Sequence, residues 1–268
     1  MLVTGASSGI GAAVARELAV RGFHVFGTVR RVEDEPSLLA AGVTPVRMDV
    51  ADGASIERAG EDVVRLLDGR LLAGLVNNAG VPGAGPLELI PLDELRRVLE
   101  VNVMGVVAVT QTFLPLLKAA RGRIVNISSI AVRMALPFMG PYAASKFALE
   151  AISDSLRREL APFGVTVTVV QPGSFKSNIW KKVEAMDTAR YRGSAYEGAL
   201  TRFRDLALRS GRAAPPPTRV ALAVARALTA RRPPIRILVV ESRIGQALRD
   251  LLPERWLDRL IMRRIWPR

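Results

Sequence analysis

A tyrosine and a lysine four residues apart could together carry out acid–base chemistry. Tyr142 and Lys146 lie in the segment PYAASKFALEAISDSLRREL, whose residue pattern predicts a helix. Side chains at positions i and i+4 share one face of a helix, so the ammonium would lie beside the phenol. A neighbouring positive charge favours the phenolate and lowers a pKa that starts at about 10. We therefore expect Tyr142 to act as a general acid or base near neutral pH.

The first residues of the chain could bind the phosphates of a nucleotide. Residues 2–11 read LVTGASSGIG: the end of an apolar strand, a turn of small residues and the start of an amphipathic helix. Glycine lets the backbone turn sharply and approach a ligand closely. The N-terminus of the next helix offers free N–H groups and the positive end of the helix dipole, which suit a pyrophosphate. The spacing G-x-x-x-G-x-G differs from the commonest dinucleotide fingerprint, and taken alone this segment could be a tight turn without a ligand.

The elements that must position these residues alternate along the chain. Strand-like apolar runs alternate with segments of helical period, which predicts an α/β fold with a parallel sheet and helices on both faces. We expect strands near 1–4, 23–29, 43–48, 71–77, 122–128, 164–170 and 235–240, and helices near 9–21, 53–68, 92–119, 141–162 and 215–231. With 268 residues, 49% of them hydrophobic, the chain can bury one large core, so a single domain over residues 1–268 is expected.

Six motifs together resemble the short-chain dehydrogenase/reductase superfamily. They are Thr4–Gly11 (TGASSGIG), Asn77–Gly80 (NNAG), Asn102 in VNVMG, Ser129 in NISS, the Tyr142/Lys146 pair and Pro172–Gly173, in the order and at the separations usual for that family. The resemblance implies a Rossmann-type, doubly wound parallel sheet of about seven strands. Residues 232–268 look most like the branch of retinol and hydroxysteroid dehydrogenases. Family members usually have several residues ahead of the position of Leu2, so we expect that the native chain could start upstream of Met1.

The resemblance also implies the roles of the catalytic residues. Tyr142 would exchange a proton with the substrate oxygen, and Ser129 would stabilise that oxygen with a hydrogen bond. Lys146 would hold the nicotinamide ribose and lower the pKa of Tyr142. Asn102 would hold a water that links Lys146 to solvent, although it could instead mark a bend in its helix, and Ser129 could merely cap a strand end. Trp180 is expected to contact the substrate together with Ser129 and Tyr142.

The cofactor contacts follow from the same resemblance. Besides Tyr142 and Lys146, the expected contacts are Gly5, Ser7, Ser8, Gly9, Ile10 and Gly11 for the pyrophosphate, Asp49 and Val50 for adenine, Asn78, Ala79 and Gly80 for the adenosine ribose, and Pro172, Gly173 and Ser177 beside the nicotinamide. Asp49 could otherwise be only a helix cap. The second strand ends with Val29 where NAD-dependent relatives carry an acidic residue, and Arg30 follows. A guanidinium there could grip a 2′-phosphate, so NADP(H) is predicted in preference to NAD(H).

Two further segments are expected to have their own roles. Residues 174–217 are polar and arginine-rich with isolated aromatics, and by resemblance they would form two helices that cover the substrate, although a solvated excursion is the alternative. The aromatic residues favour a lipophilic carbonyl or alcohol substrate. Residues 241–268 would form a C-terminal helical extension. In it the apolar stripe Trp256, Leu257, Leu260, Ile261 and Ile265, with arginines between, could contact a membrane surface, a partner subunit or its own domain.

Composition excludes several other kinds of site. Cysteine is absent and His24 is the single histidine, so thiol chemistry, a histidine triad and a two-histidine metal site are excluded, and no metal site is predicted. His24 itself is expected to be a satisfied core residue. The net charge of +13 could indicate nucleic acid, but no aromatic platform accompanies it, so none is expected as a partner.

The remaining expectations concern location and assembly. No signal peptide precedes the fold and no apolar run reaches the length of a membrane span, so a cytoplasmic protein is predicted. By resemblance it would be a homodimer or homotetramer that pairs through the helices at 92–119 and 141–162. The alternative to an enzyme is a protein of the same fold that binds NADP(H) as a sensor or scaffold without turnover, and the intact set of Asn102, Ser129, Tyr142 and Lys146 argues against it.

Overall fold

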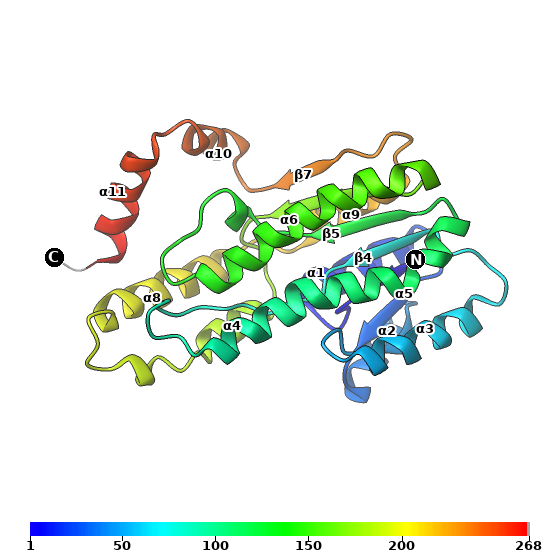
Figure 1. Ribbon diagram of the computed structural model, residues 1–268, viewed down its shortest axis with the longest axis horizontal. Coiled ribbons are helices and arrows are strands. Elements are labelled where there is room, and N and C mark those ends of the chain that lie inside the picture. Colours follow the sequence, from blue (N-terminus) through cyan, green and yellow to red (C-terminus); the bar gives the residue numbers. More distant parts are fainter. Residues whose placement is uncertain (267–268) are drawn as a thin grey trace.

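Seven parallel strands form one sheet in the order β3-β2-β1-β4-β5-β6-β7 in the computed structural model, which describes residues 1–266 (Figure 1). The strands are Leu2–Val3 (β1), Phe26–Val29 (β2), Thr44–Arg47 (β3), Gly74–Asn77 (β4), Arg123–Ile127 (β5), Thr166–Pro172 (β6) and Arg236–Val239 (β7). The order runs outward from β1 on one side and from β4 on the other. This is the doubly wound arrangement, with its switch point between β1 and β4, and it confirms the predicted Rossmann-type fold.

Helices follow the strands on both sides of the sheet. The α-helices are Gly9–Val20 (α1), Glu35–Leu39 (α2), Gly53–Leu67 (α3), Leu92–Leu99 (α4), Gly105–Ala119 (α5), Gly140–Leu160 (α6), Ile179–Glu184 (α7), Glu197–Ala213 (α8), Thr218–Thr229 (α9), Arg243–Asp250 (α10) and Glu254–Ile265 (α11). Short turns of other helical types lie at Val32–Asp34 (η1), Glu100–Met104 (η2), Ile130–Val132 (η3), Ala161–Phe163 (η4) and Ala189–Tyr191 (η5).

The alternation of side chains along the strands builds one core on each face of the sheet. Leu2, Leu75 and Ile124 are in register across β1, β4 and β5 and pack with α3 and α5. Their sequence neighbours Val3, Val76 and Val125 point to the other face and pack with α1 and α9. All six side chains are fully buried. Because successive strand residues face opposite ways, strands covered on both faces must be largely apolar, as these are apart from polar residues such as Asn77 and Asn126.

The long helix expected at 92–119 contains an irregular turn. The stretch η2 is a single π-helical turn between α4 and α5, and it carries Asn102. The combined helix Leu92–Ala119 is long and apolar enough to cross a membrane by composition, which corrects the sequence-based statement that no run reaches that length. In the fold it packs against β4, α3 and α6, the position of a core helix.

His24 departs from its predicted place in the core. Its side chain is exposed, although both ring nitrogens have partners, Thr44 Oγ1 at 3.1 Å and an Arg70 guanidinium nitrogen at 2.9 Å. The ring also lies against Phe26, with ring centroids 4.6 Å apart. The sequence predicted the satisfied hydrogen bonds but not the exposure, because β2 begins at Phe26, three residues later than the apolar pattern suggested.

Candidate active site

In the turn after β1, Gly5 and Gly11 lie so close to neighbouring backbone that neither position has room for a side chain. Gly5 and Gly9 have φ of +64° and +58°, the left-handed region that favours glycine. A Cβ on Gly11 would lie 2.2 Å from the carbonyl oxygen of Gly5, and one on Gly5 would lie 2.9 Å from Cα of Ala79. Thr4 Oγ1 accepts hydrogen bonds from the N–H groups of Asn78 and Ala79 at 2.9 and 3.0 Å, which joins this turn to the loop after β4.

The start of α1 fits the pyrophosphate of a dinucleotide. Ser8 is the N-cap residue, but its side chain makes no capping hydrogen bond. The first N–H groups of this helix therefore remain free to donate hydrogen bonds to an anion, which the positive end of the helix dipole would also attract. Gly5, Ser7, Ser8, Gly9, Ile10 and Gly11 all lie in this turn or in the first turn of α1, as expected.

Tyr142, Ser129 and Lys146 converge at the carboxyl edge of the sheet. Tyr142 is in the first turn of α6, Ser129 follows β5, and the two side chains are hydrogen-bonded. Ser129 Oγ also accepts the Ala131 N–H at 3.1 Å, so it caps η3 as well. Lys146 is 5% exposed, and its Nζ donates to the Ile127 carbonyl at 2.9 Å and lies 5.7 Å from the centroid of the Tyr142 ring. The phosphate turn leaves β1 at the same edge, which is where open α/β sheets bind ligands.

Burial decides the protonation of this pair. It raises the pKa of Tyr142, and the hydrogen bond with Ser129 only partly opposes that effect. This corrects the expectation of a lowered pKa, because burial outweighs the effect of the hydrogen bond. Burial also lowers the pKa of Lys146 to about 8, while the carboxylate of Glu150 one turn later works to raise it. The phenol is therefore a proton donor at neutral pH.

Asn102 is fully buried, and the hydrogen bonds of its side chain join two parts of the fold. Its Oδ1 accepts the Val81 N–H at 2.8 Å, and its Nδ2 donates to the Val81 carbonyl at 2.9 Å and to Ser145 Oγ at 3.0 Å. Ser145 Oγ in turn donates to the Tyr142 carbonyl at 2.7 Å. Asn102 thus ties the loop after β4 to the helix that carries Tyr142. The expected water relay through this residue stays a prediction.

Cations gather where the adenosine end of a cofactor is expected. Arg30 follows β2, and its guanidinium lies 3.9 Å from the Asp49 carboxylate. Asp49 does not cap α3, because Asp52 does so by accepting the Ser55 N–H. Burial and the charges of Arg30 and Arg97 lower the pKa of Lys182 in α7, so each of the two arginines lies close enough to repel Lys182. An anion would relieve that repulsion.

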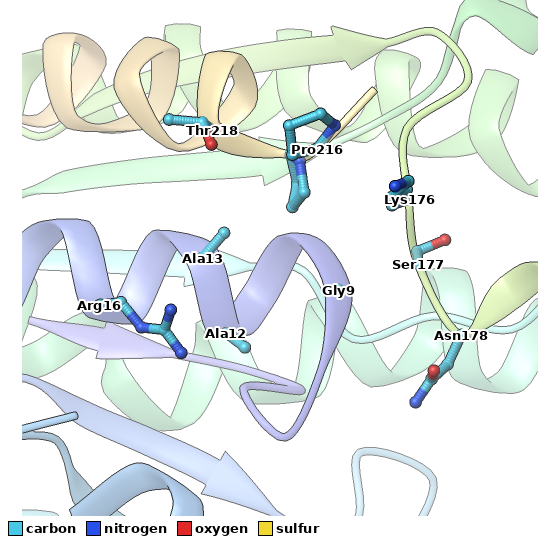
Figure 2. Close-up of a pocket in the computed structure, with 10 residues that line it drawn as sticks. Gly9, Ala12, Ala13, Arg16, Lys176, Ser177, Asn178, Pro216 and Thr218 are labelled. Atoms are coloured by element: carbon cyan, nitrogen blue, oxygen red, sulfur yellow. The ribbon is translucent and has the colours of Figure 1, made fainter. Parts of the chain in front are cut away.

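A cavity of about 520 Å³ lies on the outer side of the phosphate turn (Figure 2). Lys176, Ser177 and Asn178 form one wall, the side of α1 from Gly9 to Arg16 forms another, and the segment 216–218 at the start of α9 forms the third. A Cβ on Gly9 would lie 3.0 Å from Cβ of Ser177, so Ser177 lies directly against this turn. Gly173 follows Pro172, the last residue of β6, and donates its N–H to Val239. Ser177 therefore lies beside the phosphate turn and Gly173 follows the end of β6, while their contact with the nicotinamide stays a prediction.

Trp180 lies within the segment that was expected to cover the substrate. This segment holds α7, η5 and α8. The Trp180 indole N–H donates to the Phe175 carbonyl at 2.8 Å, and its ring lies against Gly211, where a Cβ would come within 2.6 Å of it. Trp180 therefore joins α7 to α8, and its contact with a substrate stays a prediction.

Sequence reasoning missed several residues that support the site. Ser145, Glu150 and Lys182 each act through a neighbour that only the fold supplies. Asn77 and Asn126 pair across β4 and β5, and Asn126 donates to Ser153 of α6 at 2.8 Å. The signal for Asn77 and Asn126 was present, because each is a polar residue inside an apolar strand, and a buried amide requires a partner.

Comparison with known proteins agrees with this geometry. The short chain dehydrogenase family matches residues 1–188. The chain belongs to the short-chain dehydrogenase/reductase family. It is 36% identical to the NADPH-dependent 3-dehydrocapnine reductase of Ornithobacterium rhinotracheale, over 97% of this chain and 94% of that protein. It is 37% identical to retinol dehydrogenase 5 of Homo sapiens, over 88% of this chain and 79% of that one.

Solved structures of this family have the same fold. A short-chain dehydrogenase from Streptomyces avermitilis superposes with a TM-score of 0.78 at 32% identity, covering 97% of this chain and 92% of that one. A family member from Burkholderia phymatum in complex with NAD gives a TM-score of 0.78 at 26% identity, covering 97% and 94%. This short-chain dehydrogenase/reductase is therefore an NAD(P)-dependent oxidoreductase that interconverts a carbonyl and an alcohol of a small-molecule substrate.

Proposed function

We propose that this enzyme uses NADP(H) to reduce a lipophilic ketone or aldehyde, or to oxidise the corresponding alcohol, with Tyr142 as the general acid or base. The hydrogen-bonded Tyr142–Ser129 pair, with Lys146 buried one helical turn away, is the observation that carries the proposal. These three groups lie at the same edge of the sheet as the phosphate turn, so a dinucleotide bound there could reach them.

Each side chain has a defined part in the proton and charge balance. Tyr142 donates its phenolic proton to the substrate oxygen as negative charge develops there, and its raised pKa keeps that proton available. Ser129, beside the phenol, turns its single O–H to the same substrate oxygen and donates a second hydrogen bond to it. Lys146 contributes positive charge beneath the site below a pH of about 8. The bound nicotinamide supplies or accepts the hydride, and the protein supplies position and electrostatics.

The charges around Arg30 support NADP(H) over NAD(H). Arg30 is exposed and has one nearby carboxylate, Asp49, at 3.9 Å, while Lys182 and Arg97 add two positive charges. A 2′-phosphate placed among them would gain charge-assisted hydrogen bonds, whereas a ribose hydroxyl would leave the cations facing each other. One relative is named an NADPH-dependent reductase, although a structural relative was solved with NAD.

The cluster beside the catalytic helix supports a lipophilic substrate. Phe138 lies four residues before Tyr142 and packs with Tyr196 and Phe203 of the covering segment and with Trp266. We propose that α7 and α8 form a cover whose apolar inner side receives the substrate and excludes water during hydride transfer. The similarity to a retinol dehydrogenase, whose named substrate is lipophilic, agrees with this substrate class.

Replacing the phenolic hydroxyl tests the proposal directly. In Tyr142→Phe we expect loss of at least about 100-fold in kcat with unchanged NADPH affinity, because general acid catalysis contributes roughly 10²–10⁴. The assay follows NADPH oxidation against a panel of apolar aldehydes and ketones, with NADH in parallel. Tyr196→Phe is the matched control, since its hydroxyl donates to Glu88 away from Ser129. Wild-type rates in Tyr142→Phe would refute the assignment, and a wild type that binds NADPH but reduces no carbonyl would favour a sensor.

A further inference from the structure

In the C-terminal arm, residues 241–266, α10 meets the rest of the enzyme through a polar face. Figure 1 shows α10 and α11 at one end of the molecule, beyond the end of β7. Gln246 is buried, and its Nε2 donates to Asp250 Oδ1 at 2.6 Å. The other oxygen of Asp250 accepts from Arg133 at 2.7 Å, and Arg133 immediately follows η3, the turn that Ser129 caps. The arm is thus attached to the loop of the active site by charge and hydrogen bonds.

The opposite face of α10 is apolar and exposed. Ile244, Leu248 and Leu251, at positions i, i+4 and i+7, are 76%, 61% and 80% exposed. A helix on the surface of a globular protein normally turns such a stripe inward and its polar residues outward. Here the polar side is inside, so the apolar side remains available for another surface.

The helix α11 also carries exposed apolar side chains. Ile261, Ile265 and Trp266 pack on the aromatic cluster around Phe138, so part of the predicted stripe contacts its own domain. Trp256 and Leu260, also four residues apart, are 61% and 54% exposed instead. The apolar stripe that was expected to act as one unit is therefore divided: one part packs on its own domain and the other is exposed.

Arginines accompany the exposed apolar residues. Arg255, Arg259 and Arg263 are exposed, and none of them forms an ion pair with an acidic side chain in the described residues 1–266. The chain as a whole carries a net charge of +13. If a second copy covered this face about a two-fold axis, the same arginines would face one another, because such a contact pairs a patch with itself. A negatively charged, apolar surface would accommodate both the arginines and the apolar side chains.

We propose that the outer face of the C-terminal arm docks on an anionic membrane surface. Ile244, Leu248, Leu251, Trp256 and Leu260 enter the boundary between headgroups and acyl chains, and the arginines bind lipid phosphates. Helices that combine an apolar face of this kind with basic residues lie in the plane of the membrane interface. This inference goes beyond the proposed function, because it depends on none of the catalytic residues.

Vesicle sedimentation of the full-length enzyme tests this proposal. The probes are vesicles of phosphatidylcholine alone and of phosphatidylcholine mixed with phosphatidylglycerol in equal parts. We expect binding to the mixed vesicles that is at least about tenfold stronger than to phosphatidylcholine alone, because several cations contact anionic headgroups. Ile244→Ser/Leu248→Ser/Leu251→Ser should abolish binding, and Arg255→Gln/Arg259→Gln/Arg263→Gln should remove the preference for anionic vesicles.

Controls separate membrane docking from unfolding and from self-association. Val20→Ser/Leu71→Ser removes two apolar side chains that are 80% and 63% exposed elsewhere on the surface, and it should bind like wild type. All variants should keep the wild-type melting temperature and the wild-type mass in sedimentation velocity. A blue shift of tryptophan fluorescence on mixed vesicles, absent in Trp256→Phe, would support insertion of the arm. Failure of wild type to bind mixed vesicles, or a drop in mass in the triple serine variant, would overturn the proposal, the latter in favour of a second copy.

Discussion

At the scale of single residues, burial and Glu150 act in opposite directions on the charge of Lys146. The Glu150 carboxylate raises the pKa of the lysine against the effect of burial, which lowers that pKa to about 8. In Glu150→Gln the burial is unopposed, so Lys146 should lose its proton at lower pH and the basic limb of the kcat/KM profile should move in the same direction. The profile of kcat/KM reports groups of the free enzyme. Asp154→Asn, one turn further along α6, should leave that limb in place, and an equal shift in both variants would rule out a specific effect of Glu150.

Arg30 is the residue whose charge should set the choice of cofactor. Arg30→Asp would place a carboxylate where the 2′-phosphate is proposed to bind and would offer an acceptor for a ribose hydroxyl. We expect the ratio of kcat/KM for NADPH to that for NADH to fall by at least about tenfold, the equivalent of one lost charge-assisted hydrogen bond. Arg31→Asp is the matched control, since Arg31 is exposed and faces Asp34 at 3.5 Å. A ratio that changes equally in both variants would assign the preference elsewhere.

At the scale of elements, η2 and Asn102 hold the loop after β4 against α6. Asn102→Ala would leave the Val81 N–H and carbonyl without their side-chain partner and free Ser145 from one hydrogen bond. We expect the free energy of unfolding to fall by roughly 3 kcal/mol, since each buried polar group left unpaired costs about 1–3 kcal/mol. Urea denaturation measures this change. Thr112→Ala in α5, which removes a hydroxyl bonded only to its own helix, should cost less than about 1 kcal/mol. Equal losses in the two variants would contradict the bridging role.

The sequence could predict those elements that depend on local patterns. Each of the seven strands was predicted, because apolar and β-branched runs such as Thr166–Pro172 are typical of buried strands. The phosphate turn was predicted because closely spaced glycines indicate a backbone that approaches a ligand or a neighbouring segment. The direction of the Tyr142 pKa was not predictable, because it depends on how deeply neighbouring elements bury the ring. Periodicity also shows which side of α10 is apolar. It does not show that the polar side faces the protein, because that depends on the contact of Asp250 with Arg133, which is distant in sequence.

At the scale of the whole molecule, the outer faces of α4, η2 and α6 offer a surface for a second copy. Leu92, Met104 and Phe147 are 62%, 55% and 50% exposed, and α6 packs beside both α4 and η2. Exposed apolar side chains gathered on neighbouring helices indicate an interaction site. A two-fold axis there would bring this face against itself. We therefore expect wild-type enzyme to sediment as two or four copies of the 29.0 kDa chain.

A charge placed at this surface should separate the copies. In Phe147→Glu and Met104→Glu a carboxylate would be buried without a partner in the contact, which costs several kcal/mol and favours the monomer. Sedimentation velocity should show a mass reduced to one or two copies, with an unchanged far-UV circular dichroism spectrum. Val20→Glu on α1 is the control, because Val20 is 80% exposed on the opposite side of the sheet and should leave the mass unchanged. A wild type that sediments as a monomer, or variants that keep the wild-type mass, would show that α4, η2 and α6 do not form the contact.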